Sequence, residues 1–214
     1  MAVVADIGPV KLYYFDFGDF SKGLPDDCGR SENVKLLLED AGISYEYLLT
    51  KWSDWNRVRG EWVANGFLTG SLPVLETKNG KKYFMTVPIL SFLSKKLGQY
   101  YGKNIDEEHI VDVVADLTND FYDSFVHNYW LRPDKRESHR KNEVPIHINR
   151  LERFYAANTG PYLLGSEISF ADFQVYHVIC DEEVVELPPH LTNFVKTFKK
   201  RPNIKKYLEK KKKN

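Results

Sequence analysis

The 214-residue sequence contains little cysteine, no long hydrophobic run and no excess of charge of either sign. Cys28 and Cys180 are its two cysteines, too few for a disulfide scaffold. Because no stretch of about 18 consecutive apolar residues is present, we expect no membrane-spanning helix. Met1 to Pro9 lack the basic and apolar regions of a secretory signal. We therefore expect a cytoplasmic protein.

The charges balance, with 30 Lys and Arg against 30 Asp and Glu. A neutral chain has no overall electrostatic attraction for nucleic acid or an anionic membrane, and we expect neither as a partner. The basic run from Lys205 to Lys213 is interpreted as a solvated chain end. No ligand spacing typical of a metal site is found, so no metal is expected.

The first hundred residues show an alternation of strand and helix patterns. Apolar and aromatic runs predict strands at 10–17, 44–49, 71–76 and 82–84, with Asn79-Gly80 as a hairpin turn. Apolar spacing typical of a helix predicts helices at 31–41 and 87–97. The aromatic segment 51–70 is not assigned. This order indicates an α/β domain with a mixed sheet.

After Gly98 only helical patterns follow, at 107–130, 142–158, 169–183, 193–198 and 203–210. The sequence therefore predicts an α/β domain at 1–98 and an all-helical domain at 105–214, joined by a linker at 99–104. Ser169 and Asp172 have the spacing of a capping box and are assigned to folding.

Several segments, in this order and spacing, resemble the cytosolic glutathione transferases of the tyrosine type (sigma, mu and pi). They are Lys11-Leu12-Tyr13-Tyr14-Phe15, Gly29-Arg30-Ser31-Glu32, Ser71-Leu72-Pro73-Val74-Leu75, Leu97-Gly98-Gln99-Tyr100-Tyr101-Gly102-Lys103, Ser169-Phe170-Ala171-Asp172 and Arg201-Pro202-Asn203-Ile204. The resemblance covers nearly the whole chain. It implies a thioredoxin-like domain followed by a helical domain. It also implies a homodimer that conjugates glutathione, as co-substrate, to small hydrophobic electrophiles in detoxification.

The resemblance assigns the thiol site to Tyr14 and Arg30. A free thiol has a pKa of about 8.5, so an enzyme must favour its thiolate at neutral pH. A phenol that donates a hydrogen bond to the sulfur can do this. Taken alone, Tyr13 and Tyr14 read as core aromatics; by resemblance Tyr14 is catalytic, and Tyr13 points to the opposite face because strand side chains alternate. Arg30 would support the thiolate electrostatically, although an insertion unusual for the family, at 18–27, precedes it.

The tripeptide site follows from the same resemblance. The backbone of Leu72, exposed by a cis peptide bond at Pro73, would pair with the cysteinyl part of glutathione as an added strand does. The γ-glutamyl carboxylate would bind where a helix begins at Thr86. Met85 replaces the usual Gln or Glu, and the lost hydrogen bond is worth about 1 kcal/mol.

The glycyl carboxylate is assigned to Trp55 and Arg59, while Trp52, Arg57 and Trp62 remain competitors for the same role. A loop packed by these tryptophans is an equally acceptable interpretation. Asp120 matches a family aspartate that reaches the γ-glutamyl ammonium of the partner subunit. The alternative, an acidic helix face in solvent, is preferred for the neighbouring Asp112 and Asp123.

Three alternatives keep the fold. Cys28 lies before a helix, where a thiol pKa can fall, as in the omega-like thiol transferases. The insertion and Met85 favour a non-enzymatic binding or regulatory protein. A sigma-type prostaglandin isomerase cannot be separated from a general transferase by sequence.

Overall fold

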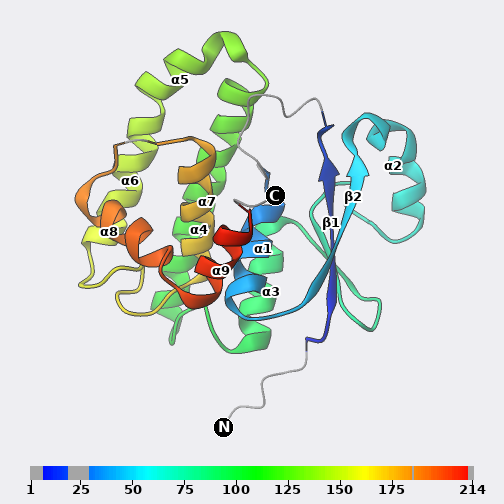
Figure 1. Cartoon of the computed structure of the whole chain (residues 1–214), viewed down its shortest axis with the longest axis horizontal. Helices are drawn as coiled ribbons and strands as arrows, with labels where there is room; N and C mark the ends of the chain where they lie inside the picture. Colours follow the sequence, from blue (N-terminus) through cyan, green and yellow to red (C-terminus); the bar gives the residue numbers. More distant parts are fainter. Residues whose placement is uncertain (1–6, 19–28, 185, 212–214) are drawn as a thin grey trace. The chain divides into compact units, whose positions relative to one another are not determined.

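The computed structural model describes residues 7–18, 29–184 and 186–211 and divides into two compact units, 1–98 and 99–214 (Figure 1). The first unit holds a four-stranded mixed sheet, and the second holds helices. This confirms the predicted fold class, a thioredoxin-like α/β part followed by an all-helical part. Cys28 and most of the insertion lie outside the described residues.

The sheet of the first unit has the strand order β2-β1-β3-β4. Its strands are β1 (Val10–Asp16), β2 (Tyr45–Lys51), β3 (Val74–Glu76) and β4 (Lys82–Phe84). β1 runs parallel to β2 and antiparallel to β3, and β3 is antiparallel to β4. The parallel pair needs a crossover, which is the helix α1 (Ser31–Asp40). Strand 71–76 was predicted too long, because the strand begins at Val74, after a cis peptide bond between Leu72 and Pro73.

Helices cover both faces of this sheet, with α1 and α3 (Thr86–Leu97) on one side and α2 (Trp55–Ala64) on the other (Figure 1). α2 was missed by sequence reasoning. It carries Trp55 and Trp62, whose rings contact Phe15 and Tyr13 of β1 at 5.1 and 5.7 Å. The alternation along β1 therefore directs Tyr13 and Phe15 to α2 and leaves Tyr14 on the other face.

The second unit is built around α4 (Ile105–Phe125), which packs against α7 (Phe170–Asp181). Its other α-helices are α5 (Arg136–Asn142), α6 (Val144–Ala156), α8 (Pro189–Phe198) and α9 (Pro202–Lys211). α4 continues as one π-helical turn, Val126–Trp130, followed by a 3₁₀ turn, Pro133–Lys135. No α-helix of the described ranges is long and apolar enough to cross a membrane.

The beginning of α7 is fixed by the capping box predicted from sequence, which is confirmed. Asp172 accepts hydrogen bonds from the backbone N–H and the hydroxyl of Ser169, at 2.7 and 2.8 Å. Its other oxygen accepts from the Tyr155 hydroxyl at 2.7 Å and from the Leu163 N–H at 3.0 Å. All four bonds are buried, so Asp172 ties α7 to α6 through Tyr155 and to the loop before α7 through Leu163.

Candidate functional site

Most of the predicted site residues lie at one end of the sheet. The last fully paired row across three strands is Tyr13 with Val74 and Val74 with Phe84. One position beyond this row, toward the same end of the sheet, lie Tyr14, Pro73 and Met85. The register thus brings together three segments that are far apart in sequence.

Tyr14 is 5% exposed, and its hydroxyl lies at the beginning of α1. The backbone N–H of Arg30 donates a hydrogen bond to its oxygen at 2.8 Å. Arg30 is the residue that precedes the helix, so the phenol oxygen lies where free amides and the helix dipole favour negative charge. Tyr14 is the acceptor in this bond, which therefore does not use the phenol's own proton.

Gly29 is a residue of this site that sequence reasoning did not assign. Its φ is +121°, and a Cβ atom added to it would lie 2.7 Å from Cε1 and 2.8 Å from the hydroxyl oxygen of Tyr14. Carbon atoms pack without repulsion at about 3.5–4.0 Å, so the Tyr14 ring requires glycine here. The available signal was a glycine directly before a predicted helix.

Tyr13 has the opposite environment. Its hydroxyl donates to Glu76 at 3.2 Å, and its ring contacts Phe67 at 5.1 Å. Burial, together with the negative charge of Glu76, raises the pKa of Tyr13 to about 12. The predicted division of the two tyrosines between opposite faces is confirmed, and Tyr13 is held as a neutral packing residue.

Leu72 and Thr86 both carry polar groups that nothing in the described part of the chain satisfies. The backbone N–H and C=O of Leu72 make no hydrogen bond to a described residue, although the residue is 8% exposed. The hydroxyl of Thr86, at the first turn of α3, is buried and also lacks a partner among the described residues. Such groups are costly unless something binds them.

Met85 precedes α3 with a φ of +66°, a conformation rarely adopted by a residue with a side chain. Backbone strain of this kind is found preferentially at ligand sites. The side chain is 52% exposed, and its sulfur accepts a hydrogen bond from the Ser71 hydroxyl at 3.6 Å.

Among the candidates for the glycyl carboxylate, Trp55 is 7% exposed and shares an apolar cluster with Tyr14 and Leu72. Arg59 is exposed, lies over Gly70 and has no ion-pair partner among the described residues. Of the competitors, Arg57 pairs with Asp54 at 3.5 Å, and Trp62 packs against Phe67 with ring centres 4.4 Å apart.

Asp120 belongs to the second unit, where it is exposed on α4. Its predicted role involves a second subunit and stays a prediction. Among the described residues, no three His, Cys, Asp or Glu side chains are grouped so as to hold a metal ion.

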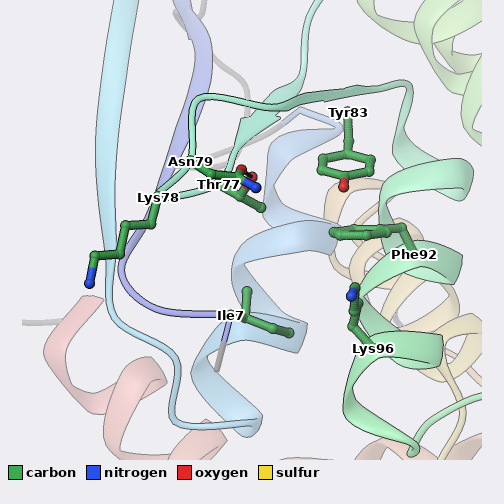
Figure 2. A pocket seen from close by; sticks show the side chains of 7 residues that line it. All are labelled: Ile7, Thr77, Lys78, Asn79, Tyr83, Phe92 and Lys96. Carbon is green, nitrogen blue, oxygen red and sulfur yellow. Dashed lines mark hydrogen bonds between the residues drawn. The ribbon is translucent and has the colours of Figure 1, made fainter. Parts of the chain in front are cut away.

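A hollow of about 520 Å³ lies elsewhere on the first unit, between the β3–β4 turn and α3 (Figure 2). Its wall includes the rings of Tyr83 and Phe92, which stack with their centres 3.6 Å apart, and the side chains of Lys78 and Lys96. The hydroxyl of Thr77 is already bonded to Asn79 at 2.7 Å. None of the predicted site residues lines this hollow, and it is not the candidate active site.

Comparisons with known proteins give matches over most of the chain. Residues 119–211 match the family model of the glutathione S-transferase C-terminal domain. The chain is 28% identical to glutathione S-transferase P 10 of Caenorhabditis elegans, covering 94% of this chain and 91% of that protein, and 29% identical to a glutathione S-transferase of Gallus gallus, covering 85% and 84%.

Among solved structures, the pi-class glutathione S-transferase of Onchocerca volvulus superposes with a TM-score of 0.78. It is 21% identical, and the match covers 95% of this chain and 93% of that one. The family model of residues 119–211, the relatives that span most of the chain and the fold thus agree in their similarity to the glutathione S-transferases.

Proposed function

We propose that this protein binds glutathione in its first unit and transfers it to small hydrophobic electrophiles, with the thiolate held by the Tyr14 hydroxyl. The observation that carries the proposal is the hydroxyl of Tyr14 at the start of α1, where it accepts the Arg30 N–H at 2.8 Å. This contact fixes the phenol oxygen while its proton can be directed to an incoming sulfur atom.

The chemical step needs little from the protein beyond the thiolate. The thiol proton passes to water, and the sulfur lone pair forms a C–S bond to the electrophilic carbon. With a chlorinated aromatic electrophile, chloride then leaves with the electron pair of the C–Cl bond. Tyr14 keeps its proton throughout and stabilises the negative sulfur by a charge-assisted hydrogen bond, worth about 1.5–3 kcal/mol.

The arginine contributes to this site first through its backbone. The Arg30 N–H holds the phenol, and the amides at the start of α1 add positive potential next to the sulfur. The guanidinium is assigned the electrostatic role that the family resemblance gives it, which is separate from the backbone contact. Arg30→Ala keeps the N–H and therefore tests the guanidinium alone.

The unsatisfied groups of the sheet edge suit the rest of the tripeptide. The Leu72 backbone next to Pro73 can pair with the cysteinyl amide and carbonyl, as an added strand does. The buried hydroxyl of Thr86 and the first amides of α3 can bind the γ-glutamyl carboxylate. Met85 offers no hydrogen bond to the same group of glutathione.

The glycyl carboxylate is assigned to Arg59, with the indole of Trp55 beside it. Arg59 is exposed and makes no ion pair with a described residue, whereas Arg57 is already paired. A guanidinium can bind a carboxylate with two parallel hydrogen bonds. Arg59→Ala is expected to weaken glutathione binding, whereas Arg57→Ala, the matched control, is not.

We also propose that the protein is a homodimer in which Asp120 binds the γ-glutamyl ammonium held by the other subunit. The carboxylate is exposed on α4, as this role requires. Analytical ultracentrifugation is expected to give a dimer. A fully active monomer would remove this role from Asp120.

The decisive experiment measures glutathione binding by calorimetry and conjugation of a chlorodinitrobenzene substrate for the wild type, Tyr14→Phe and Tyr13→Phe. We expect Tyr14→Phe to bind glutathione but to lose most of its turnover, and Tyr13→Phe to keep it. Absence of binding and turnover in the wild type would indicate a non-enzymatic protein. Glutathione-dependent disulfide reduction that disappears in Cys28→Ala, with conjugation unchanged, would indicate the thiol-transferase alternative.

A further inference from the structure

The hollow of about 520 Å³ on the first unit lies between the β3–β4 turn, α3 and Ile7, which precedes β1 (Figure 2). Its volume is in the range of small-molecule sites, about 300–1,000 Å³. Lys11 pairs with Glu76 in the sheet, so the turn that follows Glu76 lies beside the beginning of β1. Tyr14 lies toward the other end of β1. The hollow is therefore separate from the site that was assigned to glutathione.

The apolar part of the wall is mainly aromatic. The rings of Tyr83 in β4 and Phe92 in α3 stack with their centres 3.6 Å apart and their planes at 18°. Both side chains are only half-buried, so the pair keeps apolar surface exposed in the hollow. Ile7 adds an aliphatic group that lies apart from the two rings (Figure 2). Aromatic surface of this kind favours a flat aromatic ligand, which gains ring contacts as well as burial.

The β3–β4 turn adds a hydrogen-bond donor to the wall. The hydroxyl of Thr77 donates to Oδ1 of Asn79 at 2.7 Å, and the Lys81 N–H donates to the same oxygen at 3.3 Å. The amide oxygen of Asn79 is thus already used, whereas its NH₂ group makes no hydrogen bond to a described residue. An NH₂ group can only donate, so the turn offers a donor to an acceptor group of a ligand.

The charges of the described wall are all positive. Lys78 of the turn and Lys96 of α3 line the hollow, and neither makes an ion pair with a described residue. None of the lining residues that the structure describes is acidic. The Lys96 side chain extends toward Phe92, whereas Lys78 points away from the rings (Figure 2). The complementary ligand is therefore an anion, with Lys96 as its principal cation.

We propose that this hollow binds a small aromatic carboxylate. The aromatic ring lies against Tyr83, Phe92 and Ile7, and the carboxylate accepts hydrogen bonds from the Lys96 ammonium and the Asn79 amide. Hydrogen bonds to an ionised group are stronger than neutral ones, and here they select a negative charge. An aromatic ammonium ion would be repelled by the same lysines. The site does not depend on the proposed transferase activity.

Naphthoate serves as the probe, with naphthylmethanol and naphthylmethylammonium as aromatic probes of no charge or positive charge. Titrations are made by calorimetry in an excess of S-hexylglutathione, which occupies the proposed glutathione and electrophile positions. We expect saturable binding of naphthoate, and binding at least about fivefold weaker for the other two. Equal binding of naphthylmethanol would overturn the proposal, because the rings alone would then explain the affinity.

The variant Lys96→Gln removes the charge and keeps most of the apolar stem. It is expected to weaken naphthoate binding about threefold or more. Lys95→Gln is the matched control, because Lys95 is exposed on the same helix but does not line the hollow. Both variants change the net charge equally, and neither alters a buried group. Equal affinities of the two variants for naphthoate would overturn the role of Lys96.

Methyl NMR spectra locate the bound probe. A naphthalene ring in the hollow must shift the methyl signals of Ile7 by its ring current, and Ile7→Val assigns these signals. The methyl signals of Ile148, which lies in the second unit, serve as the control and should not move. Saturable naphthoate binding with unchanged Ile7 signals would place the probe elsewhere and refute the site.

Discussion

Gly29→Ala tests whether the Tyr14 ring is held by the approach of the Gly29 backbone. The added Cβ would lie 2.7 Å from Cε1 of Tyr14, and the backbone has a φ of +121°. A side chain in this conformation costs about 1–3 kcal/mol. Overpacking a buried ring costs about 1–3 kcal/mol more. The expected loss in unfolding free energy is therefore about 2–6 kcal/mol, a large share of the stability of an ordinary domain.

The control is Gly66→Ala, because Gly66 has a φ of +90° but no atom within 4 Å of the place that its Cβ would take. It carries the backbone strain without the contact, so the difference between the two variants isolates the contact with Tyr14. Unfolding is followed in urea, and turnover is measured on the folded fraction. Gly29→Ala should lose turnover and Gly66→Ala should not. Equal stability losses with unchanged turnover would refute the reasoning.

Three further predictions concern single groups. Met85→Gln restores a hydrogen-bonding side chain, so the dissociation constant of glutathione should fall about fivefold by calorimetry, and Met85→Leu should not change it; no gain with glutamine would contradict this. Ser169→Ala removes the cap of α7 and should lower the unfolding free energy by about 1 kcal/mol in a urea titration; an unchanged midpoint would argue against the cap. Burial alone would lower the pKa of His139, but the hydrogen bonds and charges of Glu182 and Glu143 outweigh it and raise the pKa. The stability that His139 gains from these two carboxyl groups is fully present below about pH 6.5, the pKa of histidine in the unfolded chain. It is lost as the pH rises through the pKa of His139 in the folded protein. Unfolding measured across this range should show the loss in the wild type, and a His139→Gln variant with the same slope would contradict it.

The sequence predicted the elements whose apolar pattern is regular. Val34, Leu37 and Leu38 have helical spacing and are buried in α1, and alternation along β1 separated Tyr13 from Tyr14. The helix α2 was not predicted, because its apolar stripe is narrow and Gly60, in its interior, disfavours a helix. The π-helical turn at Val126–Trp130 is a local change of hydrogen bonding that leaves no trace in periodicity.

The site was predictable only where a residue has a local motif. The resemblance assigned Tyr14, which lies within β1, and Thr86, with which α3 begins, one residue before the predicted start of that helix. The close approach of Gly29 to the Tyr14 ring is a contact between residues that are not neighbours in the sequence, and no local pattern contains it. The same holds for the contact between Glu182 and His139, because the two residues are 43 positions apart in the sequence.

The pKa of the bound glutathione thiol tests the central proposal most directly. It can be measured by titrating the thiolate absorbance of the complex in the wild type and in Tyr14→Phe, with Tyr13→Phe as control. If Tyr14 donates to the sulfur, the wild-type value lies below that of free thiol, about 8.5, and Tyr14→Phe raises it by about 1–2 units. An unchanged thiol pKa in Tyr14→Phe, with turnover retained, would contradict the account and assign the thiolate to another donor.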